Sequence, residues 1–398
     1  MQQGLALVGE LIRLYPVVAT RSLPLRQWYV VSLSRDLGRK PIRVEVLSRA
    51  FVLYRDQGGQ AVAHLDRCPH RNVPLSKGRC LPDDTLECPY HGWRFSPDGQ
   101  CTLIPGKVCL PTVHHRVMSF STWEERGLVW LCPDEEGRTP HEGPQVVHDY
   151  VKGIEAPLGK SIRPHAGLLK RISFPGGLHA VVENALDVPH TAILHRGLFR
   201  GAERNSIEVI LRRYRDRAEA QYLGEPPPRG IVARLLALGN SAKDLQVDHW
   251  DRFYLPGILQ VEYRLGKKTR FQITGYCCPV SEEETIVFAV ASVSSPLGRA
   301  LTQLLLTMIV PFALGVVRQD VRILEAQRQT IQSFGGECFM STEIDIMGGA
   351  IRRILKECVE RERTEGSPSK DETPQGKKAG DQGETEEPRE VTRLVLEA

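Results

Sequence analysis

The chain has 398 residues, of which 41% are hydrophobic and 25% charged, and its formal net charge is only +4. This length and composition are sufficient for two or three folded domains with hydrophobic cores of their own. The small net charge and the scattering of lysines and arginines along the chain argue against a surface built to bind nucleic acid.

The first residues, MQQGLALVGELIRLY, lack the basic start of a signal peptide. Leu5, Val8, Ile12 and Tyr15 fall on one helical face. We therefore expect a helical segment over residues 1–23 that packs on its own domain, with a membrane anchor as the alternative. Without an export signal, the ten cysteines indicate a reducing, cytoplasmic location in which Cys and His clusters bind metal.

Residues 24–135 consist of short apolar runs separated by Gly, Pro and Asp. Their β-branched and aromatic content, with partial alternation, predicts the strands of a small all-β domain. The runs are QWYVVSL, IRVEV, AFVLYR, AVAHL and GLVWLC. The turn-rich stretch 133–145 is expected to end this domain.

A dense group of cysteines and histidines lies in this domain, with the spacing Cys68-x-His70, 17 residues, Cys88-x-x-His91. A zinc site is the simplest alternative, but zinc sites usually pair Cys with Cys and His with His across short gaps. Here each loop supplies one Cys and one His, which suits a cluster whose two irons have unlike ligands. Cys80 lies between the loops without a partner at ligand spacing and is expected to be a spare thiol.

Residues 146–360 are expected to form an α+β domain, with helical patterns at both ends of a series of strands. The expected strands are SIEVILRRY, AEAQYLG, ILQVEYRL, RFQITGYCCPV and TIVFAVASV. The uncharged run Leu304–Val317 is 14 residues long, whereas a membrane span needs about 20. A buried helix without a transmembrane span is therefore expected there, with peripheral membrane contact as an alternative.

The last part of the chain, residues 361–398, is rich in Gly, Pro, Ser, Lys and Glu. It is expected to be disordered. The final VTRLVLEA is the exception, since it could dock on a partner.

A second candidate metal site lies in ENALDVPHTAILH, which ends at His195. His190 and His195 are five residues apart, which is roughly 140° on an ideal helix, so a helix break is needed to direct both at one ion. Asp187 and Asn184 precede His190 at intervals of three. Far downstream, RQDVRILEAQ places two acids on the helical block, Asp320 and, as the alternative, Glu325.

These motifs together resemble the Rieske non-heme iron oxygenases, over roughly residues 25–356. CPHR and CPYHGW are similar to the two ligand loops of a Rieske domain. The catalytic half is similar to the pattern N-x-x-D-x-x-H-x-x-x-x-H followed by D-x-x-[I/V]-[L/V]-E-x-Q. The resemblance implies an N-terminal all-β Rieske domain and a catalytic domain of helix-grip type. It also implies a [2Fe-2S] cluster on Cys68, His70, Cys88 and His91, and a mononuclear Fe(II) on His190, His195 and Asp320.

The length and the DVRILEAQ motif look most like the vanillate O-demethylase and pheophorbide a oxygenase-like subgroup. The chain departs from the plant pheophorbide-type enzymes, because it has no C-x-x-C near its end and no C-terminal membrane span. A tetrapyrrole substrate is therefore not implied.

The resemblance further implies a terminal oxygenase that uses O₂ to hydroxylate, demethylate or otherwise oxidise an apolar, aromatic or polycyclic molecule. A monooxygenase is expected rather than a dioxygenase. The chain has no Gly-x-Gly-x-x-Gly fingerprint, so electrons from NAD(P)H would come through a separate reductase or ferredoxin. A desaturase or oxidative cyclase acting on a sterol is an alternative. A Rieske electron-transfer or redox-sensing protein is the non-enzyme alternative.

In the family, subunits form a ring, so that the cluster of one subunit lies beside the iron of the next. By resemblance Asp187 would bridge His190 and the neighbour's His91 in a homotrimer, and Asn184 would belong to the catalytic group. The alternative role for Asp187 is a helix cap or a surface acid. The stretch WDRFYLPGILQVEY is expected to supply part of the wall of the substrate pocket.

Overall fold

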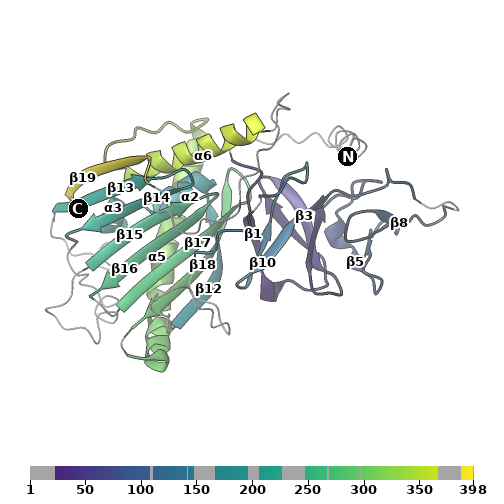
Figure 1. Cartoon of the computed structure of the whole chain (residues 1–398), viewed down its shortest axis with the longest axis horizontal. Helices are drawn as coiled ribbons and strands as arrows, with labels where there is room; N and C mark the ends of the chain where they lie inside the picture. The colour runs from purple at the N-terminus through teal and green to yellow at the C-terminus, as the bar shows by residue number, and fades with distance from the viewer. Residues whose placement is uncertain are drawn as a thin grey trace.

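The computed structural model describes residues 23–107, 111–140, 142–147, 166–195, 206–225, 247–266, 269–295, 297–365 and 387–397. Two domains lie side by side along the long axis (Figure 1). The first is all-β, and the second is a large antiparallel sheet with helices, as the sequence predicts. The helical segment expected over residues 1–23 lies almost wholly outside the described residues.

Three small sheets build the first domain, with strand orders β1-β11-β10, β2-β3-β4-β9 and β5-β6-β7-β8. The Cys88–His91 loop joins β6 to β7 of the third sheet, and the Cys68–His70 loop lies between β4 and that sheet. Two short 3₁₀ helices, η1 (Ser34–Asp36) and η2 (Leu75–Lys77), lie between strands. The strands are β1 (Tyr29–Leu33), β2 (Ile42–Val46), β3 (Arg49–Arg55), β4 (Ala61–Leu65), β5 (Arg79–Cys80), β6 (Leu86–Glu87), β7 (Arg94–Phe95), β8 (Cys101–Leu103), β9 (Ser119–Phe120), β10 (Thr122–Glu125) and β11 (Leu128–Leu131).

The second domain is built on an eight-stranded antiparallel sheet in the order β12-β18-β17-β16-β15-β14-β13-β19. Neighbouring strands are mostly joined in sequence order, so the sheet is largely a meander. The strands are β12 (Ala166–Pro175), β13 (Ser206–Arg213), β14 (Arg217–Leu223), β15 (Val247–Tyr254), β16 (Ile258–Leu265), β17 (Thr269–Pro279), β18 (Glu284–Ser294) and β19 (Glu390–Glu397).

Helices α2 (Leu178–Ala185), α3 (Val188–Leu194), α5 (Arg299–Ser333) and α6 (Ile346–Glu365) accompany this sheet. The alternation of side chains along the strands separates two cores. Cys277 and Val287 face a core shared with α2, α5 and α6. Tyr276 and Phe288 point the other way, into a core shared with the first domain, where the Tyr276 ring packs edge-on against Trp130.

The helical pattern expected at the start of this domain forms two helices in the structure, α2 and α3. Asp187 is the N-cap of α3, and Pro189 lies in its first turn. Proline is favoured at the start of a helix, but its ring clashes with the carbonyl four residues earlier. This clash falls on Ala185, where α2 ends. The local sequence thus ends α2 and begins α3, but this break precedes both histidines and does not set the angle between them.

Two strands of the large sheet, β15 and β12, escaped the sequence analysis, as did the short strands β5–β10 of the first domain. The buried face of β15 carries His249 and Asp251 between Val247 and Phe253, so its alternation is partly hidden by polar residues. The stretch expected to line the pocket is in fact β15, the following turn and β16. β12 has no clean alternation, because both of its faces pack, Leu168 on the helix side and Leu169 on the side of the first domain.

The prediction of a disordered tail over residues 361–398 is wrong at both ends of that range. Helix α6 continues to Glu365, and the carboxylate of Glu362 accepts hydrogen bonds from the amides of Leu25 and Arg26 at 2.7 and 2.9 Å. Strand β19 pairs along the whole length of β13, and Leu396 is buried in the helix-side core. VTRLVLEA therefore docks on its own chain. The residues between α6 and position 387 lie outside the described part.

Candidate metal centres

The two Cys/His loops of the first domain have the same backbone turn. In each loop the cysteine amide donates to the carbonyl five residues later, and the cysteine carbonyl accepts from the amide four residues later, at 2.8 to 3.1 Å. The partners are Val73 and Asn72 for Cys68, and Trp93 and Gly92 for Cys88. Asn72 and Gly92 both adopt positive φ, 61° and 69°, as this tight turn demands.

The cysteines of these loops are inside and the histidines outside. Cys68 and Cys88 are buried free thiols, whereas His70 is half-buried and His91 exposed. The two imidazole rings lie 4.6 Å apart, and His70 stacks on Trp93 at 4.8 Å. Burial raises the pKa of the Cys68 thiol to about 12, so a thiolate there needs a cation. Two buried sulfurs below two imidazoles fit a cluster with an inner Cys-bound and an outer His-bound iron.

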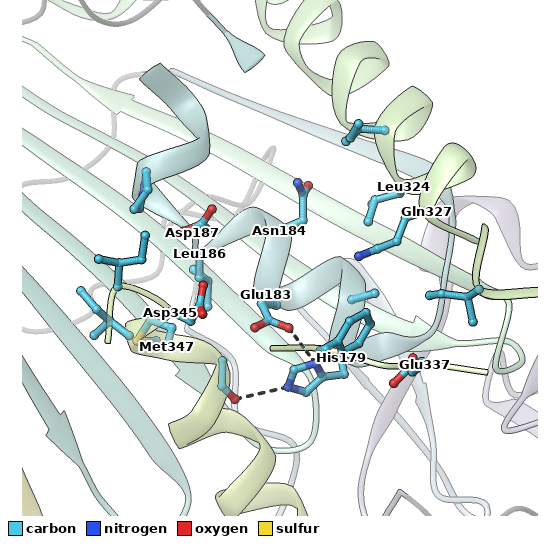
Figure 2. Close-up of a pocket in the computed structure, with 18 of the residues that line it drawn as sticks. His179, Glu183, Asn184, Leu186, Asp187, Leu324, Gln327, Glu337, Asp345 and Met347 are labelled. Carbon is cyan, nitrogen blue, oxygen red and sulfur yellow. Dashed lines mark hydrogen bonds and ion pairs between the residues drawn. The ribbon is translucent and has the colours of Figure 1, made fainter. Parts of the chain in front are cut away.

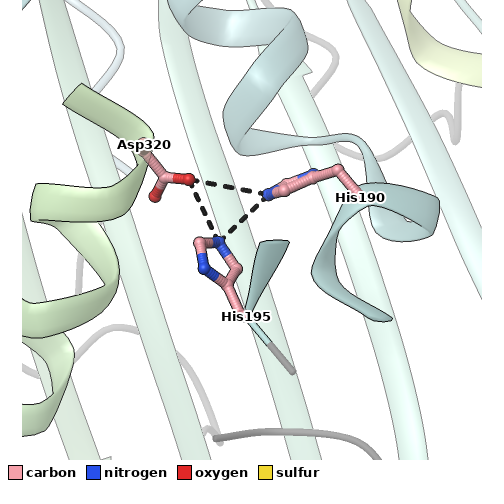
Figure 3. Close-up of side chains that lie close together, drawn as sticks. All are labelled: His190, His195 and Asp320. Atoms are coloured by element: carbon pink, nitrogen blue, oxygen red, sulfur yellow. Dashed lines mark hydrogen bonds and ion pairs between the residues drawn. The ribbon is translucent and has the colours of Figure 1, made fainter. Parts of the chain in front are cut away.

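The second group converges from α3 and α5 (Figure 3). His195 Nε2 lies 3.0 Å from Asp320 Oδ1 and 3.2 Å from His190 Nε2, and His190 Nε2 lies 3.7 Å from the same carboxylate oxygen. Three ligand atoms at right angles around one ion stand about 3 Å apart. Asp320 Oδ1 is buried, and within the described residues none of its close contacts has the geometry of a hydrogen bond. A buried carboxylate oxygen facing two imidazole nitrogens fits a cation, and this ligand set is typical of non-heme Fe(II).

The end of helix α3 between the two histidines makes this convergence possible. His190 is the third residue of α3, whereas His195 is its C-cap, with φ −105° and ψ 29°. Because His195 has left the helical path, its ring can turn toward His190 and the two planes meet at 77°. Glu325, the alternative acid, pairs with Arg328 at 2.7 Å and is not one of the converging groups.

Two further side chains lie near the second ring nitrogen, Nδ1, of the two histidines. Gln319 Oε1 lies 2.8 Å from His195 Nδ1 and is hydrogen-bonded to it. Asp187 Oδ2 lies 3.4 Å from His190 Nδ1, but that nitrogen makes no hydrogen bond within the described residues. Acceptors on the second ring nitrogen fix the tautomer and orientation of a metal-binding histidine. The sequence analysis singled out Asp187 but missed Gln319, whose only signal was its position next to Asp320.

A pocket of about 790 Å³ opens on the other side of Asp187 (Figure 2). Asn184 and Asp187 line it together with the last turns of α5 and the segment 336–348. None of the three converging ligands lines it. This pocket therefore adjoins the candidate iron site through Asp187 and is separate from the iron site itself.

A polar group inside the sheet was also missed by the sequence analysis. The ring of His249 lies between the carboxylates of Glu225 and Asp251, at 3.0 and 3.1 Å, and all three residues are buried. Tyr222 and Tyr263 stack on its two faces at 4.6 and 4.0 Å. Burial lowers the pKa of His249, but the two carboxylates outweigh burial and raise it to about 9. This group ties β14, β15 and β16 together.

Two family profiles match the chain, the Rieske [2Fe-2S] domain over residues 27–114 and the vanillate O-demethylase oxygenase C-terminal domain over residues 177–361. The chain belongs to the Rieske oxygenases. Members of this family combine a [2Fe-2S] cluster with a non-heme iron, and both ligand groups described above fall inside the matched ranges.

Named relatives agree with this membership. The Rieske oxygenase is 30% identical over 242 residues to the chloroacetanilide N-alkylformylase oxygenase component of Rhizorhabdus wittichii, an alignment covering 59% of this chain and 64% of the relative. It is 29% identical over 244 residues to the 4beta-methylsterol monooxygenase of Methylococcus capsulatus, covering 58% and 60%. These alignments span less than two thirds of the relatives' lengths.

The fold has close counterparts among solved structures. Apo dicamba monooxygenase superposes with a TM-score of 0.64 at 22% identity, covering 86% of this chain and 99% of that one. At this identity the likeness concerns the fold alone.

Proposed function

We propose that the chain is the terminal oxygenase component of a multicomponent system that oxidises an apolar, aromatic or polycyclic small molecule. One observation carries the proposal, which is the presence in one chain of a Cys₂His₂ loop pair and a separate His–His–carboxylate group. Iron with two histidines and one carboxylate keeps open positions at which O₂ can be activated with electrons that arrive through the cluster.

The residues would divide the work as follows. Cys68, His70, Cys88 and His91 hold the cluster, and the hydrogen-bonded turns described above fix their directions. His190, His195 and Asp320 hold the mononuclear iron. Asp187 and Gln319 orient the two imidazoles. Asn184 lines the pocket beside Asp187 and belongs to the same neighbourhood.

Electrons would come from a separate reductase or ferredoxin. The exposed ring of His91, next to an exposed Tyr90, is the part of the cluster site most accessible to such a partner. The exposed imidazole side of a cluster is a suitable route for electrons, since burial of the thiolates leaves the histidines nearest to solvent.

A homotrimeric ring is the proposed assembly. Figure 1 supports it, because the cluster-bearing sheet β5–β8 and helix α3 lie at opposite ends of the long axis of one chain. Electrons would therefore pass more directly between chains, from a neighbour's His91 through Asp187 to His190. The pocket beside Asp187 is rimmed by exposed apolar side chains, Phe334, Phe339 and Ile344, which suit contact with another subunit.

The reaction proposed is a monooxygenation such as hydroxylation or demethylation, carried out in the cytoplasm. Desaturation or oxidative cyclisation of a sterol is the second candidate, and the similarity to a methylsterol monooxygenase favours a polycyclic substrate for it. An electron-transfer or redox-sensing protein would not need the His–His–carboxylate group, so its presence favours the oxygenase.

Metal analysis and single-turnover chemistry test the proposal. The purified protein should be brown and contain about three irons per chain, two in the cluster and one in the catalytic site. Molecules that co-purify with it under anaerobic conditions, identified by mass spectrometry, should be oxidised when the dithionite-reduced protein meets ¹⁸O₂, and ¹⁸O should appear in a hydroxylated product. A colourless protein with stoichiometric zinc would refute the proposal.

A further inference from the structure

Helix α5 has an apolar face that nothing in the described structure covers. The 18 residues between Arg299 and Arg318 contain no charge. Over its most apolar window the helix is long and hydrophobic enough to cross a membrane, yet only 17% of that window is buried. A helix that is hydrophobic all round is normally buried in protein or lipid. The exposure of α5 therefore needs an explanation.

The exposed apolar side chains form a stripe. Leu301, Leu304, Met308 and Phe312 are 40 to 56% exposed. Their spacing of three and four residues places them on one face, over a length of about 16 Å. The adjoining face, with Leu305, Leu306 and Ile309, is buried, and Leu306 packs on Phe271 and Val293 of the sheet. We call Leu301, Leu304, Met308 and Phe312 the α5 stripe.

Basic side chains flank the α5 stripe at both ends. Arg299 precedes it, and Arg318 and Arg322 follow it, all exposed. Arg322 is 18 residues after Leu304, which is about five whole turns, so it lies on the same face. None of the three arginines has an ion pair or hydrogen bond within the described residues. The first acid on α5 is Asp320, which points to the iron site.

We propose that the α5 stripe rests on an anionic lipid bilayer, with its four apolar side chains in the boundary between headgroups and acyl chains. Apolar residues flanked by arginines match this boundary, because the arginines pair with lipid phosphates while the stripe leaves water. A second copy of the chain fits less well. Two copies paired symmetrically through this face would bring their arginines together without an acid to neutralise them.

The geometry points to a surface helix and excludes a spanning one in this fold. Asp320, on the same helix, converges with the two histidines, and the buried side of the helix packs on the sheet. The helix could leave the sheet only by dismantling that site. The bilayer would thus lie against a helix that also carries an iron ligand.

Flotation of the intact iron-loaded protein with lipid vesicles tests the proposal. The protein should float with mixed phosphatidylcholine and phosphatidylglycerol vesicles, more weakly with phosphatidylcholine alone, and less in high salt. Leu304→Glu/Met308→Glu and Arg299→Glu/Arg322→Glu should each weaken binding at least about tenfold. The matched control Val113→Glu/Val391→Glu alters two exposed apolar residues elsewhere and should bind as the parent does.

The visible absorption of the cluster and the mass in solution accompany each variant, so that unfolding or a change of assembly is detected. Absence of vesicle binding by the parent protein overturns the proposal. Equal loss in the Val113/Val391 control also overturns it. A second copy of the chain is the alternative occupant of the stripe. It is indicated if the parent does not float and the Leu304→Glu/Met308→Glu variant has a lower assembly mass than the parent, and this result also overturns the proposal. None of these outcomes depends on oxygenase activity.

Discussion

Asp187 combines two roles that one substitution can separate. Its side chain caps α3 by accepting from the amide of His190, and the same oxygen lies near the ring of that residue. Asparagine caps a helix as well as aspartate does. Asp187→Asn should therefore keep α3 and both metals, with the cluster still reducible by dithionite. Steady-state turnover should fall by about 10 to 100-fold, because the imidazole loses its charged partner.

Asp187→Ala is the companion variant, since it removes the cap as well and should cost about 1 kcal/mol of stability. Undiminished turnover in Asp187→Asn would show that the carboxylate charge has no part in coupling the sites.

Asp320 and Glu325 are two acids on helix α5 with different surroundings. Asp320 faces the two histidines, whereas Glu325 forms an ion pair with Arg328. Asp320→Ala should lose the mononuclear iron and all product, and Glu325→Ala should retain both. Iron analysis and product assays decide this. The cluster absorption should survive in both variants, because its ligands lie in the other domain. Iron loss in Glu325→Ala alone would reverse the assignment.

At the scale of elements, the buried group around His249 makes the stability of the sheet depend on pH. The pKa of His249 is about 9 in the folded chain and about 6.5 in an unfolded one. The folded state thus holds an extra proton between these values. This proton adds at most about 3 kcal/mol to the free energy of unfolding. The contribution is fully present below a pH of about 6.5 and is lost as the pH rises through about 9.

Urea unfolding at both ends of that pH window measures the effect. The free energy of unfolding of the parent should fall more steeply with pH than that of His249→Gln, which cannot take up the proton. Parallel curves for the two proteins would mean that His249 is neutral in the folded state.

Strand β19 offers a second test at this scale, because its adjacent side chains face opposite ways. Leu396 is 4% exposed and Val395 69%. Leu396→Ala should destabilise the catalytic domain by about 2 to 4 kcal/mol, through lost burial and the cavity left behind. Val395→Ala should change stability by less than about 0.5 kcal/mol. Thermal unfolding of both variants gives the comparison, and equal effects would show that β19 does not pack on the core in solution.

At the scale of the whole molecule, the proposed ring predicts complementation between defective chains. Cys68→Ala removes the cluster and His190→Ala removes the iron, so neither variant alone should turn over. Co-expressed with different tags, the two should form mixed rings in which some intact clusters face intact iron sites. Mixed assemblies purified through both tags should regain partial activity. Inactive mixed rings of the correct mass would mean that electrons stay within one chain.

Much of this architecture could be predicted from the sequence because it depends on short-range patterns. The Cys/His spacings identify the cluster loops, and partial alternation identifies the strands β1–β4, β11, β13, β14 and β16–β18. The motif around Asp187 and Pro189 also specifies locally where α2 stops and α3 begins. Backbone geometry repeats every two or 3.6 residues, so such features are readable without knowing what they touch.

Tertiary structure alone decided the features that depend on distant partners. Gln319 supports His195 from 124 residues away, and the rotation of α5 turns Asp320 inward and Glu325 outward. The polar residue His249 can lie on the buried face of β15 because Glu225 supplies a buried partner for it. The polar end of the chain forms β19 because β13 supplies the edge on which it pairs. A buried polar or edge-strand residue is stabilised by the group it meets, and the identity of that group is set by the fold rather than by neighbouring residues.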